Sequence, residues 1–237
     1  MSFDRRDEYD DRPRAAGRDE PPLSRENQDR AADRDNVKAK ARIEYRAHAI
    51  ERGCERVRET EETTVTPAMR RIEADDPDRS LTGLEFRLKG KDRIEEKVSK
   101  GMAERSLTIK QAFGEVKDAI RYTFLYPEDR YAEGVRADCQ RLKDAGFEPV
   151  DRKNSWAAQE YKGINSRWQI PENGQVFEVQ FHTRASFEAK QETHAAYERL
   201  RVLPDDHEEV YELRAHQREV SANIPMPPDV LDIQDYR

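Results

Sequence analysis

The segment VFEVQFHT, residues 176–183, places polar side chains capable of acid–base and metal chemistry at every second position. Successive side chains of a β-strand point to opposite faces, so Glu178, Gln180 and His182 share one face and the apolar residues between them share the other. The apolar face can pack into a core while the polar face lines a cleft with a carboxylate, an amide and an imidazole. A strand whose polar face simply meets water is the competing interpretation.

A second carboxylate with chemical potential lies in VKDAIRYTFLY, residues 116–126. Asp118 directly precedes the most hydrophobic strand-like run of the chain. Together with Glu178 from another strand it would supply oxygen ligands for Mg²⁺, which prefers one or two carboxylates plus substrate phosphates. An aspartate that only begins a strand or turn is the alternative.

Cations are concentrated in GLEFRLKGKDRIEEKVSK, residues 83–100. Alternation predicts a strand over 83–89, and apolar spacing predicts a helix over 91–102. Unpaired N–H groups at the start of a helix also attract anions. Five cations are available on these two elements to grip a polyphosphate: Arg87, Lys89, Lys91, Arg93 and Lys97. A solvated cationic surface is the alternative interpretation.

The loop-like segment DRKNSWAAQEYKGINSRW, residues 151–168, sets two aromatic residues among cations and amides. Trp156 and Tyr161 are set among Lys153, Asn154 and Lys162, a composition that suits stacking of an exposed aromatic on a nucleobase beside phosphates. Burial in the core is the alternative for both aromatic residues, and it is favoured for Trp156.

Composition limits the class of protein. The chain has 237 residues, of which 39% are charged, and a net charge of -7. We expect no membrane segment, because no apolar run approaches about 18 residues and the charged N-terminus does not fit a signal peptide. The two cysteines, Cys54 and Cys139, lack the spacing of a zinc site or a disulfide framework, and Cys139 fits a core position. Mild acidity argues against wrapping of nucleic acid by bulk charge.

The elements that must position these side chains follow a mixed α/β order. Residues 1–35 interleave Asp, Glu and Arg with Pro and predict a disordered charged tail. Apolar residues from Ile43 to Val57 form a narrow stripe on a helix over 37–62, and Pro67 begins a short helix after a Thr-rich break. The predicted domains are the tail 1–35, N-terminal helices 36–78 that pack on the main domain, the main domain 79–222, and a C-terminal tail 223–237.

Within the main domain we expect strand-like and helix-like segments to alternate. Tyr131, Val135, Cys139 and Leu142 mark one face of a helix that stops at Gly146. The predicted segments are 83–89, 91–102, 108–116, 118–126, 130–145, 147–152, 164–170, 175–182, 184–201 and a last helix 206–222.

Over residues 80–201 the chain resembles the synthetase domain of the RelA/SpoT alarmone synthetase family. RLKGKDRIEEK looks like the family's R-x-K followed by a helix with a further Lys, and YKGIN looks like its G-Y-x-S-x-H loop. FEVQFHT looks like its E-x-Q-x-R-T strand, and FEAKQETHAAYERLR looks like its closing helix. Each motif is weak alone, whereas four in this order are fairly specific.

The resemblance implies a nucleotidyltransferase-like mixed β-sheet flanked by helices, and transfer of the β,γ-pyrophosphate of ATP to the 3′-hydroxyl of an acceptor nucleotide. Asp118 and Glu178 would hold Mg²⁺, and Glu178 would also act as the base on that hydroxyl. Arg87 would stack on the adenine, and Tyr161 would stack on the acceptor base. The implied ATP-binding residues are Arg87, Lys89, Lys91, Arg93, Lys97 and Arg121, and the acceptor-binding residues are Tyr161, Lys153, Lys162, Asn165, Gln180 and His182.

The chain departs from the family pattern in several places. The strand D-x-x-G-x-R appears as DAIR, so Arg121 lies closer to Asp118 than the family spacing predicts. The remaining departures all fall on the acceptor side: Glu160, Gly163, Asn165 and His182. We therefore expect that the chain keeps the family's chemistry on the ATP donor but uses a different acceptor. No H-D pair with an accompanying E-D is present, so a hydrolase half is not expected.

Three functions stay open from the sequence. The first is a cytoplasmic enzyme that makes (p)ppGpp or (p)ppApp from ATP and GDP, GTP, ADP or ATP. By analogy it would be a growth-inhibiting toxin with an antitoxin or immunity protein, and delivery as an effector domain is also open. The second function uses the 3′ end of tRNA as the acceptor, supported by the cations of residues 151–168. The third is an inactive nucleotide- or RNA-binding module.

Overall fold

The computed structural model describes residues 25–236 of the chain. The chain divides into two compact units, Met1–Tyr45 and Arg46–Arg237. In the first unit the described residues belong to the helix α1, Arg25–Thr60, and the side chains of Val37, Ile43 and Tyr45 are exposed. Residues 25–35 are thus helical rather than part of a disordered tail, since the Arg, Glu, Gln and Ala residues among them are good helix formers. The remainder of that predicted tail lies outside the described residues. Within residues 25–236 no helix is long and apolar enough to cross a membrane.

The predicted stripe on α1 is buried only from Ile50 onward, through Cys54 and Val57. The expected Thr-rich break is instead one π-helical turn, Glu61–Val65, that leads without interruption into α2, Thr66–Ala74. Backbone angles stay helical through Thr60 and Thr66, and Pro67 is tolerated because it lies in the first turn of α2. The π turn brings the buried Glu61 into the second unit's core.

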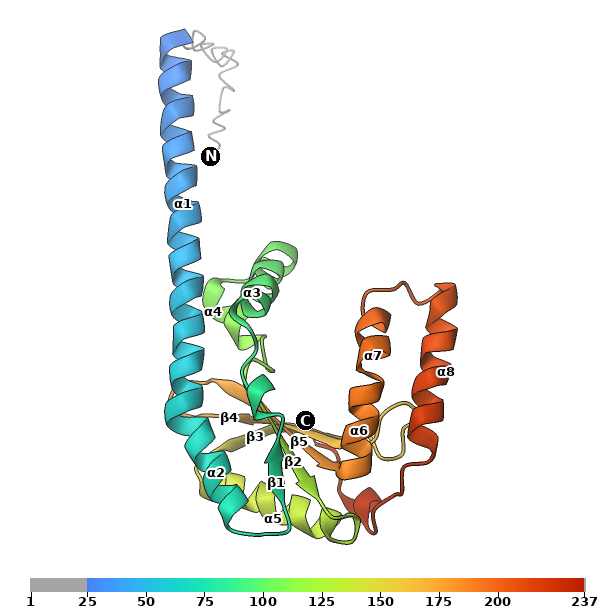
Figure 1. Cartoon of the computed structure of the whole chain (residues 1–237). Helices are drawn as coiled ribbons and strands as arrows, with labels where there is room; N and C mark the ends of the chain where they lie inside the picture. The colour runs from blue at the N-terminus through green and yellow to red at the C-terminus, as the bar shows by residue number, and fades with distance from the viewer. Residues whose placement is uncertain (1–24, 237) are drawn as a thin grey trace, which may run out of the picture. The chain divides into compact units, whose positions relative to one another are not determined.

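A five-stranded sheet with the order β1-β2-β5-β4-β3 forms the centre of the second unit (Figure 1). β2 and β5 pair in parallel, and every other pair is antiparallel. The sheet is therefore mixed, as predicted from the sequence. The strands are β1 Ser80–Thr82, β2 Arg121–Tyr126, β3 Glu148–Asn154, β4 Ile164–Gln169 and β5 Val176–Thr183.

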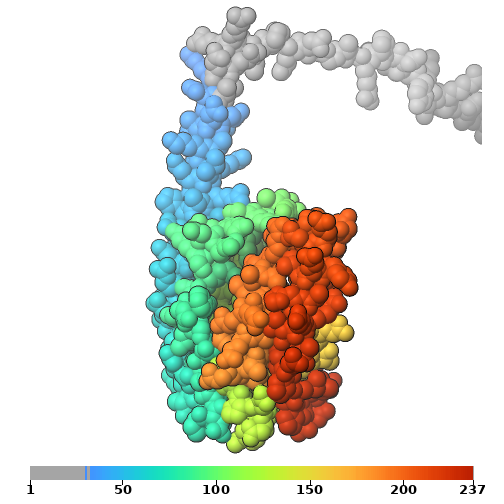
Figure 2. Space-filling view, turned by 45° about the vertical axis from the view of Figure 1, so that its right-hand side comes forward, coloured from blue at the N-terminus to red at the C-terminus, as the bar shows by residue number. Residues whose placement is uncertain are grey.

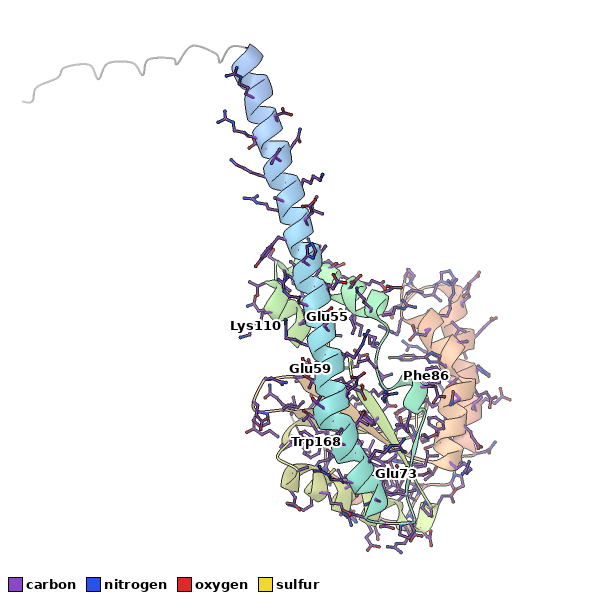
Figure 3. The ribbon with its side chains drawn as sticks, turned by 60° about the vertical axis from the view of Figure 1, so that its left-hand side comes forward. Glu55, Glu59, Glu73, Phe86, Lys110 and Trp168 are labelled. Carbon is purple, nitrogen blue, oxygen red and sulfur yellow. The ribbon has the colours of Figure 1, made fainter. Side chains whose placement is uncertain are left out.

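One face of the sheet carries the core. Phe177, Val179 and Phe181 of β5 are fully buried there, which confirms the apolar half of the predicted alternation. The helix α5, Tyr131–Asp144, packs against this side together with α2, and the predicted stripe from Tyr131 to Leu142 is buried (Figure 1). Figure 3 shows Trp168 within the sheet, where it is also fully buried.

The opposite face, here called the polar face, carries two rows of polar side chains set by the strand register. In each row the Cα atoms are partners across β2, β5, β4 and β3. The first row is Arg121, Glu178, Arg167 and Asp151, and the second is Thr123, Gln180, Asn165 and Lys153.

Two groups of helices flank the polar face (Figure 1). On one side are α3, Lys91–Arg105, and α4, Ile109–Gly114; on the other are α6, Arg184–Glu192, α7, His194–Leu200, and α8, Glu208–Ala222. The segment predicted as one helix over 184–201 is thus split at Thr193. Figure 2 shows a hollow between the green surface near residue 100 and the orange surface of α6 and α7.

The predicted strand over 83–89 is wrong. β1 ends at Thr82, and Gly83 has a left-handed φ of 63°, which turns the chain into a 3-10 helix, Leu84–Phe86. Glycine adopts this angle without steric cost, so the turn displaces the strand. Only Leu88 makes an isolated bridge, to Ile120, and Phe86 on the turn is exposed (Figure 3). Two further 3-10 turns are Glu128–Arg130 and Val230–Asp232.

The predicted C-terminal tail is packed against the sheet. Val230 and Ile233 are buried, and the Asn154 side-chain amide donates hydrogen bonds to the carbonyl oxygens of both residues. Tyr236 forms a bridge with Arg152 on the edge strand β3. This segment therefore covers an edge that would otherwise present unpaired backbone groups.

The packing of the C-terminal segment predicts that Ile233→Ala lowers the free energy of unfolding by about 2–5 kcal/mol, because it leaves a cavity at a site that is 3% exposed. Leu231→Ala, two residues away and 53% exposed, is the matched control and should change it by less than about 0.5 kcal/mol. Urea unfolding of both variants measures the difference. Equal small effects would show that the segment does not pack as described.

Candidate functional site

Three cations converge on Asp118, which lies just before β2. Lys97 Nζ, from α3, donates to Asp118 Oδ1 at 2.9 Å, and Lys89 Nζ lies 3.1 Å from Oδ2. Arg121 Nη2 donates to the same Oδ2 at 3.2 Å. The backbone supports this arrangement, since Lys89 N donates to Ala119 O and Arg121 N donates to Arg87 O.

Arg121 joins the two predicted carboxylates. Its Nη2 atom donates to Asp118 at 3.2 Å and to Glu178 Oε2 at 3.3 Å, so both carboxylates flank one point. The register explains the second contact, because Arg121 and Glu178 are Cα partners across β2 and β5. Arg121 Nε is buried and has no hydrogen-bond partner, which leaves a donor open for an anion.

Charge and burial oppose each other at Asp118. Burial disfavours its ionised form, but the hydrogen bond from Lys97 and the charge of Lys89 outweigh burial and lower the pKa to about 2. Burial lowers the pKa of Lys89, against the charge of Asp118. The site thus holds an ionised carboxylate among an excess of cations, in a chain that is acidic overall.

Arg87 is directed to a different acid. Its Nε donates to Glu61 Oε1 at 2.8 Å and its Nη1 donates to Leu84 O at 2.9 Å. Glu61 also accepts from Tyr122 Oη at 2.6 Å. Burial would raise the pKa of Glu61, but hydrogen bonds from Thr66, Tyr122 and Arg87 lower it overall. Sequence reasoning missed Glu61, which lies near the end of the helix predicted over 37–62.

Lys91 and Arg93 do not join the cluster around Asp118. Lys91 pairs with Glu51 at 2.9 Å, and Arg93 pairs with Glu96 at 3.3 Å on the exposed side of α3. The buried face of that helix, with Ile94, decides which cations reach the sheet. Lys97, also on α3, hydrogen-bonds to Asp118 instead.

Gln180 of the second polar row links Glu178 of the first row to Lys190 of α6. Gln180 Nε2 donates to Glu178 Oε1 at 2.5 Å, and Lys190 Nζ donates to Gln180 Oε1 at 2.6 Å. Sequence reasoning missed Lys190. The signal was available, since Ser186, Ala189 and Thr193 form the buried stripe of this segment and Lys190 lies on the same side.

The acceptor-side residues form a connected network. Tyr161 Oη lies 2.9 Å from Asn165 Oδ1 and 2.9 Å from His182 Nε2, and His182 Nδ1 lies 2.8 Å from Ser186 Oγ. Burial and the charge of Lys190 lower the pKa of His182 to about 3, so the imidazole is neutral at pH 7. Burial and the charge of Glu178 raise the pKa of Tyr161, so the phenol keeps its proton. His182 was expected to line a cleft but is fully buried.

Glycine is required at position 163 because the side chains of His182 and Tyr161 lie close to its backbone. A Cβ atom at this position would lie 2.7 Å from His182 Cε1 and 3.0 Å from Tyr161 Oη. Two departures from the family pattern are therefore coupled, because the His182 ring occupies the space that a side chain at position 163 would need.

Most cations of residues 151–168 are engaged within the chain. Lys162 Nζ donates to Trp156 O and Ala158 O, Arg152 donates to Gln234 O, and Arg167 pairs with Asp151. Lys153 is exposed. Trp156 is fully buried against Tyr131, which confirms the core interpretation for Trp156.

A cavity of about 490 Å³ lies away from these residues, lined by side chains of α2 and α5 that include Arg71 and Arg141. None of the predicted site residues lines it. Its volume alone gives no reason to place the chemistry there, because Asp118, Glu178 and the cations around them lie elsewhere.

The carboxylates fit a metal only in part. Among residues 25–236, no three or more His, Cys, Asp or Glu side chains form a group that could hold a metal ion. Asp118 and Glu178 nevertheless flank one cationic nitrogen, so they can share one cation. Two carboxylates with the remaining ligands from phosphate or water match the preference of Mg²⁺.

No protein-family profile and no curated protein matches the sequence, but several solved structures are similar to this chain. The chain is similar to the small alarmone synthetase 1 from Bacillus subtilis, with 16% identity, 73% of this chain and 88% of that chain covered, and a TM-score of 0.49. It is similar to a GTP pyrophosphokinase family protein from Streptococcus pneumoniae, with 16% identity, 70% and 87% coverage, and a TM-score of 0.48.

The same Bacillus subtilis synthetase bound to its product pppGpp gives 16% identity, 73% and 91% coverage, and a TM-score of 0.47. Since all three TM-scores are below 0.5, these similarities do not establish an activity for this chain. The function proposed below therefore rests on the geometry of the polar face.

The lowered pKa of Asp118 predicts a pH-dependent contribution to stability. Its pKa is about 2 when folded against an ordinary 3.8, so the contribution is fully present above about pH 4 and is lost as pH falls toward 2. Asp118→Asn should therefore lower the free energy of unfolding by about 2 kcal/mol at pH 6 and by much less at pH 2. Urea unfolding at both pH values measures this.

Glu115→Gln is the matched control, because Glu115 is half exposed in a surface pair with Arg105 and should change stability by less than about 1 kcal/mol. An equal loss for Asp118→Asn at both pH values would contradict the ion-pair interpretation.

The space at position 163 predicts that Gly163→Ala lowers the free energy of unfolding by about 1–3 kcal/mol through overpacking against His182. Gly114→Ala in α4 meets nothing within 4 Å and should change stability by less than about 1 kcal/mol, in the stabilising direction. Thermal unfolding compares the two variants. A tolerated alanine at 163 would mean that the His182 ring does not occupy this space.

Proposed function

We propose that this chain is an enzyme of the RelA/SpoT type that transfers the β,γ-pyrophosphate of ATP to the 3′-hydroxyl of a purine nucleotide. One observation carries the proposal: Arg121 Nη2 contacts both Asp118 and Glu178, so the paired strands β2 and β5 present two carboxylates and their cations at one place. The four motifs that resemble the family lie on the elements that form the site around Asp118, Arg121 and Glu178.

The donor side fits a triphosphate. Lys89, Lys97 and Arg121 surround Asp118. Within residues 25–236 the two lysines pair with no acid besides Asp118, so they can turn toward phosphate oxygens, whereas Arg121 also pairs with Glu178. The open Nε of Arg121 is a further donor. Phosphoryl-type transfer depends mainly on position and on cations at the developing charge, which these residues supply.

Arg87 suits the adenine. Two hydrogen bonds, to Glu61 and to Leu84 O, fix the plane of its guanidinium group, and 37% of the side chain is exposed. A planar cation held in this way can stack on a base without losing its own pairing. Lys91 and Arg93 are not needed for this role.

Asp118 and Glu178 would hold Mg²⁺, which when bound to the phosphates neutralises their charge. Glu178 would also accept the proton of the acceptor hydroxyl. Its side chain is 12% exposed, and both carboxylate oxygens accept hydrogen bonds, from Gln180 and Arg121, so its direction is fixed.

On the acceptor side, Tyr161 would stack on the base, with its hydroxyl held by Asn165 and His182. GDP, GTP, ADP and ATP are the candidate acceptors. The tRNA alternative has less support, since Lys162, Arg152 and Arg167 are engaged within the chain. A cytoplasmic site of action, growth inhibition and an antitoxin partner stay predictions.

Incubation with γ-labelled ATP and Mg²⁺ plus each purine nucleotide, or deacylated tRNA, tests the proposal. We expect label on a purine nucleotide, with one AMP released per transfer, because the β,γ-pyrophosphate leaves as a unit. Glu178→Gln should lower the rate about 10²–10⁴-fold through loss of the base. Glu188→Gln, on the exposed side of α6, should leave the rate within about twofold.

ATP binding without transfer to any acceptor would instead support an inactive nucleotide-binding module. Label found only on tRNA would show that the 3′ end of tRNA is the acceptor. Full activity of Glu178→Gln would remove Glu178 from the chemistry.

A further inference from the structure

Lys190 is a partly buried lysine that the proposed chemistry does not use. It lies on α6, which packs against β2 and β5, and its ammonium group points to the second polar row. Its polar contact there is Gln180 Oε1 at 2.6 Å, and the ring of Phe187 lies 5.4 Å from Nζ. A lysine in the buried stripe of a helix is costly unless it makes a specific contact.

The contact extends to Glu178. Lys190 Nζ donates to Gln180 Oε1, and Gln180 Nε2 donates to Glu178 Oε1 at 2.5 Å. Thr123 Oγ1 also donates to Gln180 Oε1, at a longer 3.4 Å. Since Arg121 holds the other oxygen of Glu178, the carboxylate is fixed from two sides.

The chemistry of the three groups determines which way the amide faces. An ammonium group only donates and a carboxylate only accepts, so the oxygen of Gln180 must face Lys190 and its NH₂ must face Glu178. If the amide flipped, its oxygen would face the carboxylate and its NH₂ would face the ammonium group. Both contacts would then be repulsive.

We propose that Lys190 is a positioning residue that fixes the orientation of the Gln180 amide and thereby directs the Glu178 carboxylate. The catalytic part of this inference rests on the proposed function, whereas the contact between the three side chains does not. Lys190 acts through Gln180 and touches no reacting atom.

The surroundings of Lys190 make the contact sensitive to pH. Burial lowers the pKa of Lys190, the charge of Arg121 on β2 lowers it further, Glu178 on β5 opposes both, and the result is about 8. The neutral His182 of β5 carries no charge, and Arg218 of the adjacent α8 is paired with Glu160. A neutral amine both donates and accepts, so above about pH 8 it no longer selects one orientation of the amide.

Kinetics of three variants test the catalytic part. Lys190→Met keeps the volume and removes the donor, and should lower kcat about 10- to 100-fold with the KM for ATP within twofold, because the carboxylate is no longer directed. Lys190→Arg, a donor that stays charged, should recover at least part of that loss. Lys143→Met, exposed on α5, is the matched control and should behave as wild type.

The pH profile separates positioning from a structural role. In wild type kcat/KM should fall above about pH 8, as Lys190 loses its proton. This fall should be absent in Lys190→Met and should move to higher pH in Lys190→Arg. A kcat of Lys190→Met within twofold of wild type would overturn the inference and leave the proposed function standing.

A measurement that needs no turnover is the pair of ¹H–¹⁵N cross-peaks of the Gln180 side-chain NH₂ group, assigned by their loss in Gln180→Glu. In wild type they should shift with a midpoint near pH 8, and this midpoint should vanish in Lys190→Met. The inference would be overturned if these signals shifted neither with pH in wild type nor on substitution of Lys190 by Met. If wild type transfers label to no acceptor, the proposed function fails, and these signals still decide whether Lys190 fixes the amide.

Discussion

The parallel pairing of β2 with β5 is the constraint on which the site depends. Its register makes Arg121 and Glu178 Cα partners, and the antiparallel pairing of β4 with β5 adds Arg167 to the same row. A slip of one residue would turn Glu178 toward the core and bring Phe177 or Val179 to the polar face. The buried aromatic residues of the opposite face forbid that slip, so the hydrophobic core fixes where the carboxylate points.

Around this pair of strands, each buried acid is paired with neighbouring cations. Asp118 is buried enough to resist ionisation, yet Lys97 and Lys89 lower its pKa to about 2, while burial lowers the pKa of Lys89. The same logic applies to Glu61 with Arg87. A local excess of cations therefore persists in a chain with a net charge of -7, because position rather than the total sets the field at the polar face.

The acceptor side shows how departures from a family pattern can depend on one another. The His182 ring fills the space beside Gly163, holds Tyr161 through its hydroxyl and contacts Ser186 on α6. We therefore expect that replacing any one of these residues alone would disturb the others. Lys190 belongs to the same helix, so α6 supports both the acceptor network and the second polar row.

The sequence by itself determined the mixed α/β class and the alternation of β5, because local periodicity and residue chemistry are recorded in a linear pattern. It predicted that Asp118, Glu178, Lys89 and Lys97 lie together, partly through the family resemblance, and the structure brings these side chains to one place around Arg121. Tertiary structure alone decided that Gly83 turns the chain out of a strand, that the C-terminal segment packs on β3 and that Lys91 and Arg93 pair elsewhere. It also brought Glu61 and Lys190 to their partners, because such contacts join residues 26 and 10 positions apart, and only packing and strand register can set them.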